Sequence, residues 1–348
     1  MSLAALNAKL AGADLEAHEI DAAFAIIMDG AAGHEDIKRF LELSLPRMHE
    51  PAWIAGGAGA LRVRMKPVAA PAGAIDVCGT GGDGAHTLNI STAVAFVVAG
   101  CGVPVAKHGN RAMSSKSGAA DVLEALGVKL TGHVPTLEHC LAEAKLAFLF
   151  AQNHHPAMRH VALVRREIGK RTIFNLLGPL SNPAGVKRQL VGVFALGFVE
   201  PVATALRELG AESAIVVHGA GGLDEFSFAD GQTRAISLDT RGRILEMEDM
   251  DPWALTRAFG VEIAAPGALA GGNARFNADA LRALLEGRAQ DSAYERAVML
   301  NAAAALIAAG RFTAASVIDA WAAARDSIRG GAAKGILDKL ITISQRAP

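Results

Sequence analysis

The chain has 348 residues with a formal net charge of −1, and 51% of its residues are apolar while 20% are charged. This length allows two domains with a large core, and the apolar fraction excludes a disordered protein. The near-zero charge argues against bulk nucleic-acid binding, which favours a basic chain or face, so we expect no nucleic-acid partner.

The cysteines and the N-terminus indicate the compartment. Cys78, Cys101 and Cys140 are an odd set without C-x-x-C spacing, which favours neither a disulfide framework nor a zinc site. The N-terminus lacks a signal-peptide pattern, and apolar runs such as residues 302–310 fall far short of the ~20 residues that span a bilayer. We therefore expect a soluble cytoplasmic protein with reduced thiols and no membrane partner.

Helical periodicity dominates the first ~65 residues. Ile20, Phe24, Ile27 and Met28 share one helix face, and a short Pro-rich linker follows at residues 67–73. The pattern predicts a helical N-terminal domain over residues 1–66, a hinge over 67–73 and an α/β domain over 74–348.

A glycine-rich segment, residues 79–84, leaves the apolar strand predicted over residues 74–78. Its glycines let the backbone turn tightly and approach a ligand closely. Residues 87–92 then offer three good N-cap types before an Ala/Val-rich helix that runs to about Gly100. Because a helix N-terminus presents unpaired N–H groups, this segment suits a phosphate.

Two other nucleotide motifs compete with this interpretation. Gly79, Gly81 and Gly84 satisfy G-x-G-x-x-G, but a dinucleotide fold also needs an acidic residue ~20 positions on, and none occurs between Asp83 and Asp121. A P-loop is excluded because no glycine loop runs into Gly-Lys-Ser/Thr.

A second strand, predicted over residues 103–106, brings Lys107 and Arg111 to the same edge. His108 and Asn110 lie between them, where they suit contact with a second substrate or a proton. Two anion-binding elements at adjacent strand ends predict a substrate with more than one phosphate.

The rest of the chain alternates strands with helices, which predicts an α/β fold with a largely parallel sheet flanked by helices. Ligand sites in such sheets lie outside the carboxyl ends of the strands. Further strands are predicted over residues 147–151, 189–194 and 214–218, and helices over residues 119–126, 156–168, 201–209, 278–285, 293–309 and 314–325.

Asp224 and Glu225 follow the last of these strands and a glycine-containing turn. Adjacent carboxylates can hold Mg²⁺, although a solvated acidic turn is the alternative. A phosphate site elsewhere in the chain favours the metal, since magnesium neutralises a diphosphate and helps it leave.

The helix after His154 and His155 carries two candidate carboxylate contacts, Arg165 and Arg166. They point ~100° apart on a helix, so only one can face the cleft. A guanidinium at this place suits bidentate binding of a carboxylate. Of His154 and His155, we expect one to serve only in capping the helix and in packing.

These motifs, taken together, resemble the anthranilate phosphoribosyltransferases of the phosphorylase-like glycosyltransferases. The resemblance rests on Gly79-Thr80-Gly81-Gly82-Asp83, on Asn89-Ile90-Ser91-Thr92 and on the run from Lys107 to Ser115. Further similarity follows at residues 118–127, 154–158, 171–183 and 218–225, within a span from about residue 15 to 340.

The resemblance implies transfer of phosphoribosyl from phosphoribosyl diphosphate to the amine of anthranilate, a step of tryptophan biosynthesis. It also implies two Mg²⁺ per subunit, a homodimer through the helical domain, and packing of helices near residues 171–188 with that domain. It selects Arg165 over Arg166 for the carboxylate of anthranilate.

The family's site residues carry over position by position. Those implied for phosphoribosyl diphosphate are Gly79, Gly82, Asp83, Thr87, Asn89, Ile90, Ser91, Thr92, Lys107, His108, Gly109, Asn110, Arg111, Ala112, Met113, Ser114, Ser115 and Ala119. Those implied for anthranilate are Gly79, His108, Asn110, His155, Arg165 and Gly178. Those implied for the metal are Ser91, Asp224 and Glu225.

The chain departs from the family pattern at Ala119, where serine is frequent, and at Gln152, where proline is common. Two other classes share the fold: a pyrimidine nucleoside phosphorylase-like enzyme, which the acidic pair disfavours, and a non-catalytic nucleic-acid-binding relative, which the net charge disfavours. No strong general base is expected, because the aromatic amine is already neutral at pH 7.

Overall fold

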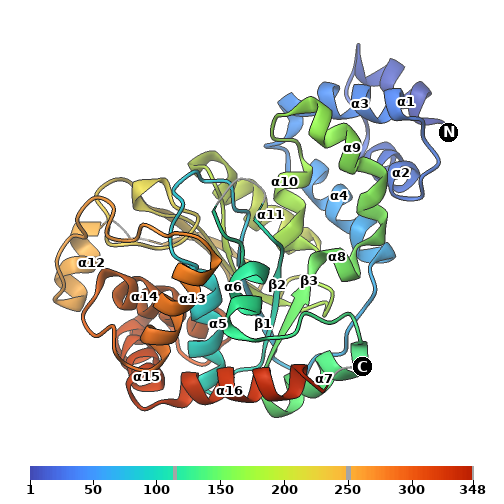
Figure 1. Ribbon diagram of the computed structural model, residues 1–348. Coiled ribbons are helices and arrows are strands. Elements are labelled where there is room, and N and C mark those ends of the chain that lie inside the picture. Colours follow the sequence, from blue (N-terminus) through green and yellow to red (C-terminus); the bar gives the residue numbers. More distant parts are fainter. Residues whose placement is uncertain (113–115, 248–251, 347–348) are drawn as a thin grey trace.

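The computed structural model describes residues 1–112, 116–247 and 252–346, and these form a seven-stranded sheet with helices on both faces (Figure 1). The strand order is β3-β2-β1-β4-β5-β6-β7. The first five strands in the chain run parallel, and the last two pair antiparallel at one edge. The strands are β1 (Ile75–Gly79), β2 (Val105–Gly109), β3 (Leu146–Phe150), β4 (Arg188–Gly192), β5 (Ser213–His218), β6 (Arg234–Leu238) and β7 (Ile244–Glu246). The predicted α/β class and largely parallel sheet are confirmed.

The strand order places a topological switch point between β1 and β4. From β1 the chain moves outward through β2 to β3, and then returns to the opposite side of β1 as β4. The register sets Gly79 beside Gly192, and Gly192 beside Val217, so three strands end together at one edge. Crevices at such switch points are where open α/β sheets bind ligands.

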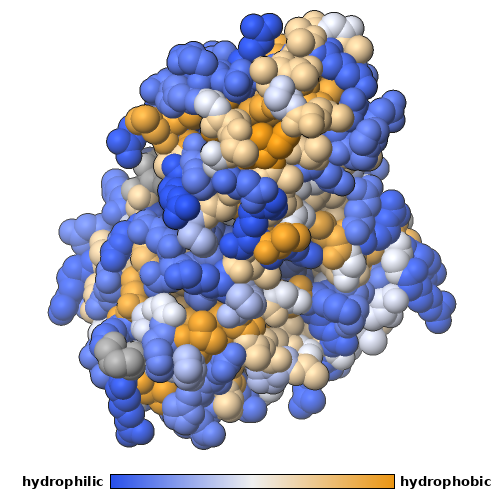
Figure 2. Space-filling model, turned by 90° about the vertical axis from the view of Figure 1, so that its right-hand side faces the viewer, coloured by the Kyte–Doolittle hydropathy of each residue, from blue (hydrophilic) through white to orange (hydrophobic). Residues whose placement is uncertain are grey.

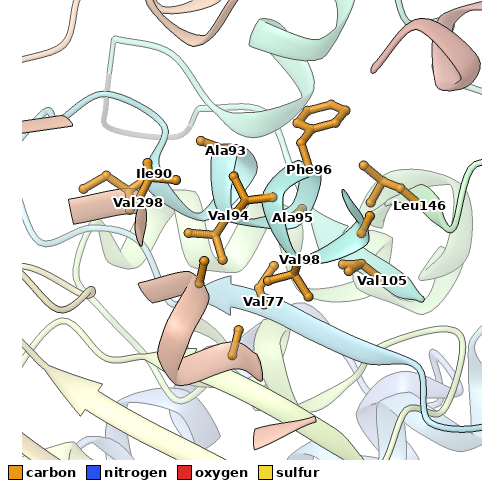
Figure 3. Packing of buried hydrophobic residues seen from close by; sticks show 14 of the residues in the cluster. Val77, Ile90, Ala93, Val94, Ala95, Phe96, Val98, Val105, Leu146 and Val298 are labelled. Atoms are coloured by element: carbon orange, nitrogen blue, oxygen red, sulfur yellow. The ribbon is translucent and has the colours of Figure 1, made fainter. Parts of the chain in front are cut away.

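One face of the sheet is covered by α5 and the C-terminal helices. Nearly every residue of α5 is buried, as its Ala/Val-rich sequence requires of a helix packed on several sides. In Figure 3, Val98 of α5 lies close to Val77 of β1, and Val298 of α14 packs beside Ile90. The helices on this face and at its edge are α5 (Ile90–Gly100), α6 (Ala119–Leu126), α7 (Val134–Glu143), α12 (Pro252–Phe259), α13 (Ala274–Leu285), α14 (Ala293–Ala308), α15 (Val317–Arg329) and α16 (Ala332–Ser344).

The other face is joined to the N-terminal helices through a second core. Phe24 meets Phe40, Trp53 and Phe174 edge-on, with ring centroids 5.5–6.3 Å apart. The same buried cluster extends to Val191 and other residues of β4, β5 and β6. Most helices of this part are grouped at the upper right of Figure 1, with α8 and α11 below them. They are α1 (Leu3–Leu10), α2 (Ala17–Met28), α3 (His34–Leu43), α4 (Pro51–Arg64), α8 (Ala151–His154), α9 (Arg159–Ile168), α10 (Phe174–Leu180) and α11 (Val199–Glu208).

The linker between the helical part and the sheet is tied down at two points. The Lys66 N–H donates to the carbonyl of His154 at 2.8 Å, and the Val68 N–H donates to the carbonyl of Pro183 at 3.1 Å. The division at residues 67–73 into two domains stays a prediction. Throughout the described part of the chain, every helix is too short or too polar to cross a membrane.

One predicted boundary is wrong in a way that changes the site. The second strand was expected to end at Ala106, but β2 runs to Gly109 and pairs with β3 along its whole length. Lys107 and His108 therefore lie in a buried strand, opposite Phe148 and Leu149, and not in the following loop.

Candidate active site

The glycine-rich loop leaves β1 with a left-handed backbone at several positions. Gly81, Gly82 and Gly84 have φ values of +64°, +75° and +80°, a conformation that only glycine adopts without strain. Arg171, between α9 and α10, donates a hydrogen bond to the Gly82 carbonyl and stacks its guanidinium 4.3 Å from the Phe194 ring. The helical part thus contacts the loop directly.

The segment after β5 folds back across the strand ends, and three glycines make room for it. A Cβ on Gly79 would lie 2.1 Å from Oδ2 of Asp224. A Cβ on Gly192 would lie 1.4 Å from the Asp224 carbonyl oxygen, and one on Gly219 would lie 1.8 Å from that of Glu225. The acidic pair reaches the switch point because no side chains stand there.

Asp224 and Glu225 join Asp83 of the glycine-rich loop in one acidic cluster. One carboxylate oxygen from each residue lies within 4.8 Å of the others. Oδ2 of Asp224 accepts a 2.7 Å hydrogen bond from the Gly81 N–H, whereas Oε2 of Glu225 is buried without a hydrogen-bond partner. Ser91, at the start of α5, lines the same small cavity as Asp224 and Glu225.

Burial disfavours the charged forms of the carboxyl groups in this cluster. It raises the pKa of Asp224, and the charge of Asp83 adds to the shift. Burial and then the charge of Asp224 raise the pKa of Glu225 well above its ordinary value. Carboxylate oxygens held together at such a cost are typical of a site for a hard cation such as Mg²⁺, and the unpaired Oε2 of Glu225 fits that ion.

Lys107 lies beneath the cluster, where its Nζ donates to the Val77 carbonyl at 2.6 Å and to Oγ of Ser91 at 3.2 Å. Burial lowers the pKa of Lys107, and the carboxylate of Asp76 opposes that shift. Asp76 is fully buried and accepts hydrogen bonds from the His108 N–H and from Nδ2 of Asn182. A buried amine and a buried carboxyl therefore lie near the strand ends, each held by its own hydrogen bonds.

His108 points to the opposite face from Lys107, toward α10. Its Nδ1 lies 2.9 Å from the Gly178 carbonyl, which only accepts, so Nδ1 carries the proton. Its Nε2 lies 3.2 Å from Nε2 of His155. Burial lowers the pKa of His108 to about 3 and that of His155 to about 4, so both rings are neutral at pH 7. His154 instead turns its Nδ1 to the Lys66 carbonyl, 2.8 Å away.

Arg165 is half-buried on α9, while Arg166 is exposed. The Arg165 guanidinium lies 5.8 Å from the Phe174 ring centroid, and burial lowers its pKa. Within the described residues it makes no hydrogen bond or ion pair. A half-buried guanidinium without a carboxylate partner in the described part of the chain suits an anionic ligand.

Arg111, which was expected to contact the anionic substrate, has acidic partners of its own. Its guanidinium donates to Asp121 of α6 at 2.9 Å and to both carboxylate oxygens of Glu124 of α6, at 2.5 and 2.9 Å. Asp121 also accepts from the N–H groups of Ala112 and Gly118, so Arg111 and the loop before α6 are held together. An anion at Arg111 has to compete with these carboxylates.

The remaining expected contacts surround the start of α5 and α6. Asn89 is the N-cap residue of α5 but makes no side-chain capping bond, and Ile90, Ser91 and Thr92 form its first turn. Thr87 pairs with Ala270 in an isolated bridge. The other contacts are Asn110 and Gly109 at the end of β2 and Ala119 at the start of α6. Met113, Ser114 and Ser115 lie outside the described residues.

Comparison with known proteins identifies the class of enzyme. The family model described as "Glycosyl transferase family, a/b domain" matches residues 72–334. Anthranilate phosphoribosyltransferase from Chelativorans sp. (strain BNC1) is 50% identical over 97% of this chain and 96% of its own length. That from Rhizobium meliloti (strain 1021) is 52% identical over 96% and 95%.

Solved structures agree. The crystal structure of anthranilate phosphoribosyltransferase from Thermus thermophilus has a TM-score of 0.88 and 36% identity, covering 99% of this chain and 100% of that one. The chain belongs to the anthranilate phosphoribosyltransferase family. The resemblance expected from the motifs is confirmed, and with it a glycosyltransferase-type enzyme. A structure of the Saccharomyces cerevisiae enzyme in complex with PRPP and Mg, 24% identical over 99% of this chain and 98% of that one, shares the fold with a TM-score of 0.87.

Sequence reasoning missed several residues that shape this candidate site. Gly192 and Gly219 admit the acidic segment, and Asn301 of α14 holds it by bonding both the N–H and the carbonyl of Phe226. Asp76 lies in a strand that periodicity alone marked as apolar, and it accepts hydrogen bonds from the His108 N–H and from Nδ2 of Asn182. Asp83 was expected to contact the diphosphate, but it was not predicted to join Asp224 and Glu225 as a third carboxylate. The sequence signal for this was its position in the glycine-rich loop.

Proposed function

We propose that this chain transfers the phosphoribosyl group of 5-phosphoribosyl 1-diphosphate to the amino group of anthranilate, releasing diphosphate in the biosynthesis of tryptophan. One juxtaposition carries the proposal. A buried acidic cluster and an N-terminus of α5 without a side-chain cap meet at the switch point. The neutral His108 of β2 faces the helical part, where Arg165 of α9 has no carboxylate partner among the described residues. The first pair suits a metal-bound diphosphate, and the second suits an aromatic acid.

The diphosphate end is built from the acidic cluster and α5. Asp224, Glu225 and Ser91, with Asp83, would hold Mg²⁺, two ions per subunit in our proposal, and the metal would neutralise the leaving diphosphate. The N–H groups at the start of α5 supply donors that need no proton transfer. The loop residues Gly79, Gly82 and Thr87 would frame the same substrate.

The acceptor end orients the amine without a strong base. Arg165 would bind the carboxylate of anthranilate, and His108, His155, Asn110 and the Gly178 carbonyl would line its ring and amine. Because the pKa of His108 is lowered to about 3 by burial, this ring is a poor base at neutral pH. Catalysis then rests on positioning the neutral amine against the anomeric carbon and on stabilising the leaving group.

We further propose that residues 67–73 form a hinge and that the helical part makes a homodimer contact. Large exposed apolar side chains support the second idea: Met1, Val63 and Leu163 lie on the helical part and are 75%, 81% and 56% exposed. Figure 2 shows apolar residues gathered on the upper part of the face that it presents.

The activity is tested by following the fluorescence of anthranilate. We expect it to fall only when phosphoribosyl diphosphate and Mg²⁺ are both present, with diphosphate appearing in equal amount. Cleavage of a pyrimidine nucleoside by inorganic phosphate, without loss of anthranilate, would overturn the proposal.

A further inference from the structure

Asn89 is an N-cap residue that does not cap its helix. An asparagine at this position normally turns its side-chain oxygen to the N–H of the second or third helical residue. Asn273 does so for α13, accepting from the Phe276 N–H at 3.0 Å. Asn89 makes no such bond to α5.

The side-chain oxygen of Asn89 is instead taken by Asn277 of α13. Nδ2 of Asn277 donates to Oδ1 of Asn89 at 2.8 Å, across 188 positions of sequence. Asn277 is only 1% exposed, and its own Oδ1 accepts from the Gly272 N–H at 2.7 Å. Because a backbone N–H only donates, this contact decides which end of the Asn277 amide is the oxygen, and hence that its nitrogen faces Asn89.

The orientation of Asn89 follows from that of Asn277. With Oδ1 toward Asn277, Nδ2 of Asn89 points the other way, toward the Ser117 carbonyl 3.5 Å away. The N–H groups of Ser91 and Thr92, which a capping Oδ1 would occupy, donate to no acceptor in the described part of the chain. Asn89 thus leaves the start of α5 open.

The backbone keeps the two asparagines in register. The Leu88 N–H donates to the Leu269 carbonyl at 2.9 Å, and the Gly271 N–H donates to the His86 carbonyl at 2.8 Å. A Cβ on Gly271 would lie 2.4 Å from the Thr87 carbonyl oxygen, so these segments touch without side chains between them. The segment before α13 is therefore fixed against the loop before α5.

We propose that Asn277 is a positioning residue for the diphosphate site: by holding Oδ1 of Asn89, it keeps the N–H groups of Ser91 and Thr92 open to an anion. This inference rests on the proposed function. Without Asn277, Oδ1 of Asn89 turns to cap α5 and occupies the donors that the diphosphate uses.

The first test compares affinities for Mg²⁺-phosphoribosyl diphosphate by calorimetry. Asn277→Ala is expected to weaken binding about tenfold or more, with the kcat at saturating substrate and the KM for anthranilate changed less than about twofold. In an Asn89→Ala background, where no oxygen remains to cap the helix, Asn277→Ala should change the affinity less than about twofold. Equal weakening in both backgrounds would overturn the inference.

Asn277→Asp separates orientation from charge. The new carboxylate draws Nδ2 of Asn89 toward itself, which turns Oδ1 toward the anion site, so binding should weaken at least as much as in Asn277→Ala. If Asn277→Asp weakens binding equally in the Asn89→Ala background, repulsion by the carboxylate is the cause and the inference fails.

Asn7→Ala is the matched control, because Asn7 is a buried amide of α1, 2% exposed, that donates to the Asp36 carbonyl at 2.9 Å. It should lower Tm similarly and leave the affinity unchanged. A substrate-free measurement separates this inference from the proposed function. In ligand-free Asn277→Ala, hydrogen exchange at Ser91 or Thr92 should slow as Asn89 caps the helix, and unchanged exchange would refute the role of Asn277 even in a chain that binds substrate.

Discussion

The buried carboxyl of Glu225 lowers the stability of the fold at a place where the proposed metal site requires a carboxylate. Burial and then the charge of Asp224 raise the pKa of its carboxyl, while its buried Oε2 has no hydrogen-bond partner. Between the ordinary carboxyl pKa and the raised one, the folded chain retains a proton that the unfolded chain has released. The free energy of unfolding therefore falls as pH rises through this window in the absence of metal.

Glu225→Gln should remove that dependence. In EDTA at pH 8 we expect its Tm to rise by roughly 2–4 °C, the shift that about 1 kcal/mol produces in domains of 150–250 residues. Mg²⁺ should raise the Tm of the unmodified chain and have little effect on the variant. Thermal unfolding at several pH values measures both. Glu208→Gln, at an exposed position of α11, is the control; a Tm for Glu225→Gln that follows pH as the unmodified chain does would contradict the argument.

Arg165 and Arg166 form a natural comparison at neighbouring positions. Arg165→Ala should remove a charge-assisted contact worth about 1.5–3 kcal/mol, which corresponds to a loss of roughly 10- to 150-fold in anthranilate affinity. Arg166→Ala, at an exposed position, should change that affinity much less. Titration followed by anthranilate fluorescence measures the affinity of both variants. Equal losses of affinity would show that we have assigned the wrong face of α9 to the substrate.

The elements that build the site meet through a few contacts between loops. Arg171 spans from the segment before α10 to the Gly82 carbonyl and the Phe194 ring. It is the kind of contact that sequence spacing cannot reveal, because Gly82 and Phe194 follow different strands, β1 and β4. Its planar fork can donate and stack at the same time, which a lysine cannot do.

Arg171→Lys should therefore loosen the glycine-rich loop without unfolding the chain. We expect a rise of about five- to tenfold in the KM for phosphoribosyl diphosphate, the loss of roughly one hydrogen bond, with Tm changed by less than about 2 °C. Steady-state kinetics at fixed anthranilate test this. Arg325→Lys on α15, whose guanidinium pairs only with Asp326 among the described residues, should leave the same KM unaltered. A KM in Arg171→Lys equal to that of the unmodified chain would contradict a role for this contact.

At the scale of the whole molecule, the N-terminal helices share their core with the sheet. The apolar helix face of Ile20, Phe24, Ile27 and Met28 can be covered either by the α/β part or by a second copy of the chain. The buried cluster around Phe24 and Phe40 continues to Val191 and Val216, so the sheet covers much of this surface. Val63 and Leu163 stay exposed in the single chain, and in our proposal a second copy would cover them.

The dimer proposal makes a prediction about these positions. Val63→Asp with Leu163→Asp should give a monomer that still binds phosphoribosyl diphosphate, because burying two carboxylates at an interface is costly. Light scattering at micromolar concentration reports the oligomeric state. Ile318→Asp, at a 49% exposed position of α15, should leave a dimer intact. A monomeric unmodified chain would refute the proposal outright.

The sequence alone determined the class of fold and the family, and it predicted a candidate site at the strand ends. Strand and helix periods, the glycines of the loop at residues 79–84 and the N-cap types before α5 act over a few neighbouring residues, so they can be read locally. The helix predicted over residues 119–126 has those bounds in the structure, because its capping residue and its C-terminal glycine are adjacent to it.

Only the tertiary structure decided which of those residues contact one another. Strand pairing with β3 buried Lys107 and His108, and α6 supplied the carboxylates that hold Arg111. The acidic cluster, Arg171 on Gly82 and Asn277 on Asn89 each join segments that lie far apart in the chain. Their distances depend on packing and register summed over the whole sheet, and those are set by contacts that no local pattern contains.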